Sequence, residues 1–146
     1  MASLAERQED DGESGHRTFT IGGHMTRDDV VAVLALRQDA VDRRDWAAFR
    51  ALYAEDAKLE SPLAGTVQGP DAIVSATDAF FVAFPEALIM PQPPIIDGHR
   101  AVVVAEGAGT HVGAIMGLPP SGRAFRLLST FVFVLRDNRI VDERRI

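Results

Sequence analysis

The sequence predicts an α+β fold, and the hydrophobic pattern indicates this class in three ways. Between residues 28 and 84 apolar residues recur at helical spacing, whereas from residue 95 onward they alternate with a period of two. Helices followed by long antiparallel strands are typical of α+β domains. The strands expected at 101–112 and 123–135 are largely apolar on both faces. Helices can cover one face of such a sheet, and the other face must meet a second subunit or line a closed cavity.

Three helices are expected in the first half of the chain. Thr26 is a suitable N-cap for a first helix over 28–43. Asp45 caps a shorter second helix, which turns back on the first and carries the apolar residues Trp46, Phe49, Leu52 and Tyr53. The third helix starts at Pro70, because proline is favoured in the first helical turn, and it ends at Pro85.

Five strands are expected, at 57–61, 95–96, 101–115, 123–135 and 139–146. Pro62 stops the first of them, and a loop follows to residue 68. Asp97-Gly98 is a typical tight hairpin turn between the second and the third. Gly107 and Gly109 lie in the middle of a strand, where glycine favours a bend or bulge, so we expect the sheet to curl.

Composition excludes several classes of function. The chain has 146 residues, enough for one domain, and its net charge of −6 argues against nucleic acid as a partner. The absence of cysteine excludes disulfides, a thiol nucleophile and a zinc–thiolate site. The four histidines show no metal-ligand spacing, and no run of about 18 uncharged apolar residues occurs. We therefore expect no metal, no membrane partner and a cytoplasmic location.

The chain divides into two parts by composition. Residues 1–25 are acidic and contain few aliphatic side chains, so we expect a flexible tail. Gly23-His24-Met25 also resembles a cloning junction, in which case Met25 is the natural start. Residues 26–146 form the expected domain, and whether the natural chain extends beyond Ile146 stays open.

Several short motifs are spread over this domain. They are Asp-Trp at 45–46, Ser-Pro at 61–62, Phe-Pro at 84–85, Gly-Thr-His at 109–111 and Gly-Leu-Pro-Pro-Ser-Gly at 117–122. With these motifs the chain resembles the SnoaL-like polyketide cyclases of the NTF2-like superfamily. The resemblance implies a cone in which a strongly curved, mostly antiparallel sheet and three helices enclose a pocket. It also implies cofactor-free proteins that form dimers or tetramers through the outer face of the sheet.

The family's reactions are only partly matched by the residues present. Cyclases of this group close a ring by an intramolecular aldol reaction that uses an aspartate and a nearby histidine. No acidic residue occurs in 123–135, the strand that carries the cyclases' aspartate. Ser61 stands where related ketosteroid isomerases have their aspartate base, and Arg37 stands near their tyrosine. Neither mechanism is therefore fully supported.

Two residues are the candidates for catalysis. His111 lies on a strand face beside Gly107 and Gly109, which leave room around an imidazole that can exchange protons near neutral pH. Glu60 lies on a short strand, where a carboxylate facing an apolar cavity would have a raised pKa. Each has an ordinary alternative, which is a histidine satisfied by a backbone carbonyl and a glutamate in a surface ion pair.

Six residues are the candidates for substrate binding, namely Arg37, Ser61, Phe80, Phe84, Met90 and Ser129. The guanidinium and the hydroxyls would bind a ligand oxygen, and the apolar side chains would line the mouth of the pocket. Glu143, Arg144 and Arg145 are expected to form an ion-pair network at the edge of the sheet or at an interface, with Glu143 in the pocket as the alternative.

The leading hypothesis is a small cofactor-free enzyme that cyclises or isomerises a polyketide-like or cyclic carbonyl metabolite by proton transfer. The alternative is a module of the same fold that binds a small molecule or mediates assembly without catalysis. Epoxide hydrolysis is a weaker alternative, because it needs an Asp–Arg–Asp set that these strands do not supply. A purely apolar pocket would favour binding, and two titratable groups about 3–4 Å from a common point would favour catalysis.

Overall fold

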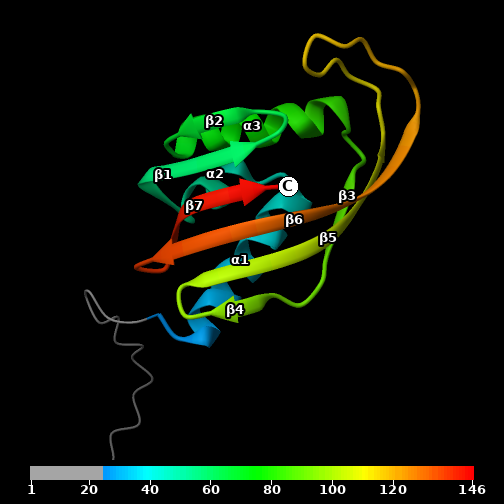
Figure 1. The fold of residues 1–146 in the computed structure, drawn as a ribbon. Helices are drawn as coiled ribbons and strands as arrows, with labels where there is room; N and C mark the ends of the chain where they lie inside the picture. Colours follow the sequence, from blue (N-terminus) through cyan, green and yellow to red (C-terminus); the bar gives the residue numbers. More distant parts are fainter. Residues whose placement is uncertain (1–24) are drawn as a thin grey trace, which may run out of the picture.

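The computed structural model describes residues 25–146, so the predicted tail lies outside the described residues. Three helices come first among them, interrupted by two strands, and five more strands follow (Figure 1). The helices are α1 (Arg27–Arg43), α2 (Trp46–Arg50) and α3 (Pro70–Ala83). The strands are β1 (Tyr53–Ser61), β2 (Gly65–Gln68), β3 (Leu88–Pro91), β4 (Ile95–Asp97), β5 (Arg100–Thr110), β6 (Ala124–Arg136) and β7 (Arg139–Arg145). The α+β prediction is confirmed.

The ends of α1 are fixed by local polar contacts. Thr26 Oγ1 accepts a hydrogen bond from the backbone N–H of Asp29 at 3.1 Å, and the Asp29 carboxylate accepts one from the Thr26 N–H at 2.9 Å. Arg44 follows the helix in the left-handed conformation, with φ 54°. Its guanidinium donates to the carbonyl oxygens of Pro85 and Ala87 and lies 3.7 Å from the centroid of the Phe81 ring. These contacts tie the turn after α1 to the end of α3.

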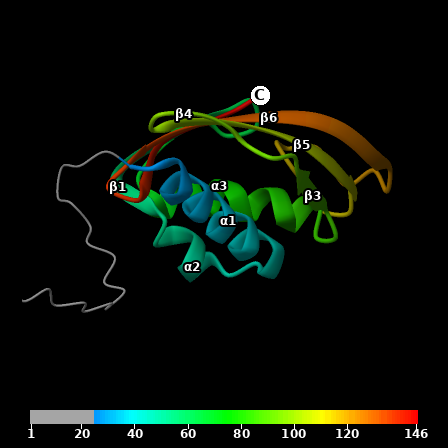
Figure 2. The same ribbon diagram turned by 90° about the horizontal axis from the view of Figure 1, so that it is seen from below.

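One mixed sheet of seven strands forms the second layer. Its order is β2-β1-β7-β6-β5-β3, and β4 pairs with a separate part of β5. The β1–β7 pair is parallel and all the others are antiparallel. All three helices lie on one face of the sheet (Figure 2). The core lies between the layers and includes Val30, Phe49, Ile73, Phe133 and Ile140, all of them buried.

The structure differs from the predicted elements at four places. The second helix ends at Arg50, and Tyr53, which was expected on it, starts β1. Residues 65–68 form β2 instead of a loop, because they pair with β1 directly after a tight turn. Residues 88–91 form β3, which the sequence analysis did not predict. The strand expected over 101–115 ends at Thr110, since the N–H groups of Val112 and Gly113 donate to the carbonyl oxygen of Ala83 instead. This segment therefore caps the C-terminal end of α3.

None of the helices within residues 25–146 is long and apolar enough to cross a membrane.

Candidate functional site

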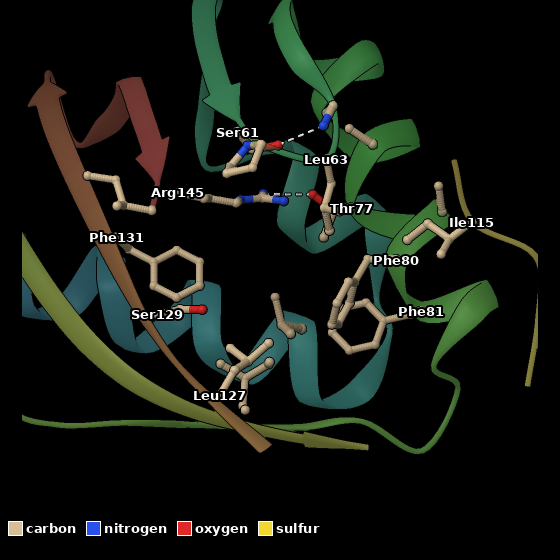
Figure 3. A pocket seen from close by; sticks show the side chains of 18 of the residues that line it. Ser61, Leu63, Thr77, Phe80, Phe81, Ile115, Leu127, Ser129, Phe131 and Arg145 are labelled. Carbon is tan, nitrogen blue, oxygen red and sulfur yellow. Dashed lines mark hydrogen bonds between the residues drawn. The ribbon is translucent and has the colours of Figure 1, made fainter. Parts of the chain in front are cut away.

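A cavity of about 570 Å³ lies between the helices and the inner face of the sheet. Figure 3 shows aromatic and aliphatic side chains from α3 and β6 on opposite sides of it. Most of the wall is apolar and includes Ala76, Phe80, Phe81, Ile89, Phe125, Leu127 and Phe131. A cavity of this size and character is typical of small-molecule sites.

The polar groups of the cavity gather toward one end. Arg145 extends from β7 to α3, where its guanidinium donates to Thr77 Oγ1 at 2.8 Å (Figure 3). Thr77 donates its own proton to the carbonyl oxygen of Ile73 at 2.8 Å, so its oxygen is free to accept from Arg145. The Nε atom of Arg145 is buried and has no hydrogen-bond partner. An unmade hydrogen bond on a buried cation is costly. The Arg145 side chain also lines the cavity, so its guanidinium is a cationic group that a ligand there would meet.

A buried ion-pair network supports this end of the cavity. Glu143 is completely buried, and its two carboxylate oxygens are held from different sides. Arg37 Nη2 donates to Oε1 at 2.5 Å. Tyr53 and Arg145 donate to Oε2 at 3.0 and 3.2 Å. Arg37 also donates to the Tyr53 hydroxyl oxygen at 2.9 Å, which leaves the hydroxyl proton for Glu143.

The network carries one more positive than negative charge. Burial raises the pKa of Glu143, but the charges of Arg145 and Arg37 and the Tyr53 hydrogen bond outweigh it, so the pKa lies below its ordinary value. Burial also raises the pKa of the Tyr53 hydroxyl, which therefore stays neutral. Burial disfavours the charge on Arg37, yet the charge of Glu143 and the interactions with Tyr53 together more than offset this and raise the Arg37 pKa. Two guanidinium groups thus share one carboxylate at the edge of an apolar cavity.

A bulge in β7 decides which side chains point inward. Leu135 pairs with Ile140, whereas Val134 pairs with Asp142, so β7 contains one extra residue at this point. Strict alternation from the buried Ile140 would place residues 142 and 144 inside. The bulge reverses the alternation and turns Glu143 and Arg145 toward the helices.

Four of the eight predicted site residues line this cavity, namely Arg37, Ser61, Phe80 and Ser129. Four do not, namely Glu60, Phe84, Met90 and His111. Phe84 contacts the cavity indirectly, because its ring packs 4.9 Å from the ring of Phe80. Met90 pairs with the exposed Glu106, and the neighbouring residue Ile89 faces the cavity in its place.

The two predicted catalytic residues lie apart from each other and outside the cavity lining. Glu60 forms exposed ion pairs with Lys58 and Arg144 at 3.5 and 3.3 Å. His111 lies after β5, where its Nδ1 accepts a hydrogen bond from the N–H of Ser121 at 3.2 Å. The ring proton is then on Nε2, which is buried without a partner, and the ring packs on Phe84. The structure therefore does not bring these two groups together at one point.

The sequence analysis missed three parts of the site. Thr77 was not singled out, and Tyr53 was expected on the second helix although it belongs to β1. Arg145 was placed in a network at the sheet edge or an interface. The edge expectation is wrong, because β7 lies between β1 and β6. Of the three residues, only Arg144 forms an exposed pair. Glu143 is buried beside the cavity but is not among the residues that line it, so the alternative that places it in the pocket is not borne out. The one sequence feature that could have indicated these positions was the run Glu143-Arg144-Arg145, which interrupts the alternation of apolar and polar residues in the last strand.

Comparison with known proteins identifies the family. The family model of the SnoaL-like polyketide cyclases matches residues 31–146. The chain belongs to this family. None of the curated proteins matches it.

Solved structures show the same fold in relatives of this SnoaL-like protein. A protein from Jannaschia sp. CCS1, assigned as a SnoaL-like polyketide cyclase, is similar with 19% identity and a TM-score of 0.76, over 82% of this chain and 85% of that one. IdmH from Streptomyces antibioticus, assigned as a polyketide cyclase, has 25% identity and a TM-score of 0.69, over 80% and 90% of the two chains. An NTF2-like protein of unknown function from Burkholderia pseudomallei K96243 has 22% identity and a TM-score of 0.70, over 84% and 91%.

Proposed function

We propose that this SnoaL-like protein binds a polyketide-type or cyclic carbonyl metabolite and promotes its cyclisation or isomerisation through an enolate. Membership of the cyclase family supports this class of ligand. The cavity supports it as well, because a mostly apolar wall suits a carbon skeleton and hydrogen-bond donors at one end suit a carbonyl oxygen.

The observation that carries the proposal is the guanidinium of Arg145, which lines the cavity within a network of net positive charge and keeps an Nε–H without a partner. When an α-proton leaves a ketone, the C–H electron pair becomes part of the enolate C=C bond. The carbonyl π pair becomes a lone pair on oxygen, which then carries the negative charge. A fixed donor in a poorly solvated cavity stabilises that charge more than it stabilises the neutral ketone. The enolate carbon then attacks a second carbonyl group or takes a proton at another carbon.

Proton transfer needs a separate base in this proposal. Within the described part of the chain, the cavity lining contains neither a carboxylate nor an imidazole side chain. The base in this proposal is a water molecule that enters the cavity with the ligand and accepts the α-proton. Catalytic roles for His111 and Glu60 stay predictions, since each would have to reach a ligand from outside the lining.

The same absence favours binding without catalysis as the second candidate function. Such a protein would hold the ligand oxygen at Arg145 and leave its α-protons untouched. Deuterium exchange distinguishes the two functions without knowledge of the natural substrate. The probe is 2-tetralone, a bicyclic ketone with acidic α-protons, and loss of its α-proton signals in D₂O is followed by NMR.

The Arg145 side chain is the test of this proposal. We expect the wild type to accelerate exchange, and Arg145→Met to lower the acceleration at least tenfold, because loss of one oxyanion donor costs about 10²–10³ in rate. Arg145→Lys keeps the charge beside Glu143 but lacks the Nε–H donor, so it should fold and exchange slowly. Arg144→Met is the matched control, because its side chain points to the opposite face and pairs with Glu60.

Equal exchange by the wild type and both Arg145 variants would refute the assigned role of Arg145. Saturable binding of 2-tetralone with no acceleration of exchange would refute catalysis on this ketone and support the binding function.

A further inference from the structure

A second cavity of about 410 Å³ lies between α1 and the sheet, beside the first. Its inner wall is largely apolar and is formed by α1, β3, β5 and β6, with Leu34, Ala35, Val103 and Phe133 among its residues. Two acidic residues line it as well, and both already have partners. Asp39 pairs with Arg43 at 2.7 Å, and Asp42 accepts a hydrogen bond from Gln38 at 2.9 Å.

The two cavities share a wall made by Arg37, Gln38, Ile89 and Phe131. Arg37 is fixed by Glu143 and Tyr53, and its guanidinium lies 5.5 Å from the centroid of the Phe131 ring. The Phe131 ring stacks on Phe133 at an interplanar angle of 7°. These side chains are therefore held in place by the core.

Gln38 is the weakest part of the shared wall. Its Nε2 donates to the carbonyl oxygen of Ile89 at 3.0 Å, which joins α1 to β3 across the gap, and to the exposed Asp42. Each such hydrogen bond contributes little net stability, because breaking it exchanges a bond within the protein for one with water. A ligand that buries a few methylene groups at this point gains a comparable free energy.

We propose that the second cavity accepts an apolar chain or ring of the ligand whose oxygen lies at Arg145, so that the ligand extends past Gln38 from one cavity into the other. This inference rests on the proposed function. The shared wall supports it, because the two spaces adjoin at the same four residues. The chemistry of the second cavity supports it too, because an apolar wall with its acidic groups already paired favours a hydrocarbon segment over a charged one.

A series of 4-alkylphenols, from methyl to nonyl, tests the inference. The phenol oxygen is the probe for the Arg145 end, and affinity is measured by calorimetry against alkyl length. Each buried methylene should increase affinity about three- to fourfold. In the wild type we expect this rise to continue past the length that fills the first cavity.

Ala35→Phe places a large side chain in the second cavity alone. Ala35 is exposed and does not line the first cavity, so the substitution should not disturb the core. Ala32→Phe is the matched control, because it makes the same change one turn earlier on α1, at an exposed residue that lines neither cavity. We expect Ala35→Phe to bind short alkylphenols like the wild type, and to lose at least tenfold in affinity for the longest ones.

The outcomes separate this inference from the proposed function. If Ala35→Phe follows the wild type and Ala32→Phe at every chain length, the second cavity takes no part in binding and the inference is wrong. If the wild type binds no alkylphenol of any length, the assignment of the first cavity fails, and the inference that rests on it fails as well.

Discussion

At the scale of single residues, Glu143 is the buried anion that joins the polar network beside the cavity. Its carboxylate holds Arg37 of α1 and Arg145 of β7 in position. Removing the charge of Glu143 leaves two guanidinium groups facing an apolar space without an anion. A buried cation without a counter-ion lowers the free energy of unfolding far more than an exposed ion pair raises it.

We expect Glu143→Gln to lower the free energy of unfolding by about 3–5 kcal/mol, as for other broken buried ion pairs. Urea denaturation followed by circular dichroism measures this change. Glu60→Gln is the control, because Glu60 forms exposed pairs with Lys58 and Arg144. This substitution should lower the free energy of unfolding by less than about 1 kcal/mol. Similar losses in the two variants would contradict the importance of the buried network.

The same residue predicts a pH dependence. Folding lowers the pKa of Glu143 below its ordinary value of 4.5, so the folded state binds the proton less tightly than the unfolded state. The stabilisation is therefore complete above the unfolded pKa and is lost as the pH falls through the folded pKa. We expect the wild type to lose stability below about pH 5. Glu143→Gln should lose less over the same range, and parallel profiles for the two proteins would argue against this assignment.

At the scale of elements, the segment after β5 is fixed to the end of α3 by close backbone approach. A Cβ atom on Gly113 would lie 2.5 Å from the carbonyl oxygen of Val82, which is rigid backbone. On Gly109 it would lie 2.9 Å from Phe125 Cε1 and 3.1 Å from Ala87 Cβ. On Gly107 the nearest atom, at 3.3 Å, is the flexible end of Leu127. The three glycines thus differ in how easily their surroundings can yield.

We expect alanine substitutions to destabilise in the order Gly113, Gly109, Gly107, with about 2–3 kcal/mol for the first and less than about 1 kcal/mol for the last. None of the three glycines has a positive φ, so the expected loss comes from steric contact of the added Cβ atom and not from backbone strain. Thermal unfolding of the three variants measures the order. A larger loss at Gly107 than at Gly113 would show that the contact with α3 does not constrain this segment.

At the scale of the whole molecule, the helices leave one face of the sheet uncovered. Half-buried and exposed apolar residues gather on that outer face, namely Leu88, Ile95, Val102, Val104, Val132 and Val134. Apolar residues on an open sheet face commonly mark an interface. Self-association through this face, as a dimer or tetramer, stays a prediction.

We expect Val132→Glu to weaken self-association at least tenfold, because a charge replaces an apolar side chain at the centre of the face. Sedimentation equilibrium measures this change. Leu36→Glu is the control, because Leu36 is 57% exposed on α1, on the helical side of the molecule. Unchanged association of the Val132 variant would exclude this face as the interface.

The periodicity of apolar residues was enough to predict the three helices and the four longest strands. Thr26, Asp45 and Pro70 lie where the structure starts its helices, since capping and proline preferences depend on neighbours within one turn. The pattern divided β5 into its two faces correctly, but only the structure shows that the face of Ala101, Val103 and Ala105 is the buried one. The short strands β2 and β3 were not, because each depends on a partner strand and has little pattern of its own.

The candidate site was only half predictable. Arg37 and Ser129 line the cavity as expected, whereas Met90 and Glu60 lie on the opposite faces of their strands. A period-two pattern defines the two faces of a short strand, but it does not say which one meets the helices.

For this protein, local sequence determines the fold class, the helix ends and the family motifs, because each depends on residues close together in the chain. Tertiary structure alone decides the polar end of the cavity. One extra residue in β7 turns Glu143 and Arg145 inward, and the parallel pairing of β7 with β1 brings Tyr53 beside them. No local pattern signals either event. The extra residue shows only in the pairing of β7 with β6, and the β1 and β7 partners lie more than 80 residues apart in the chain.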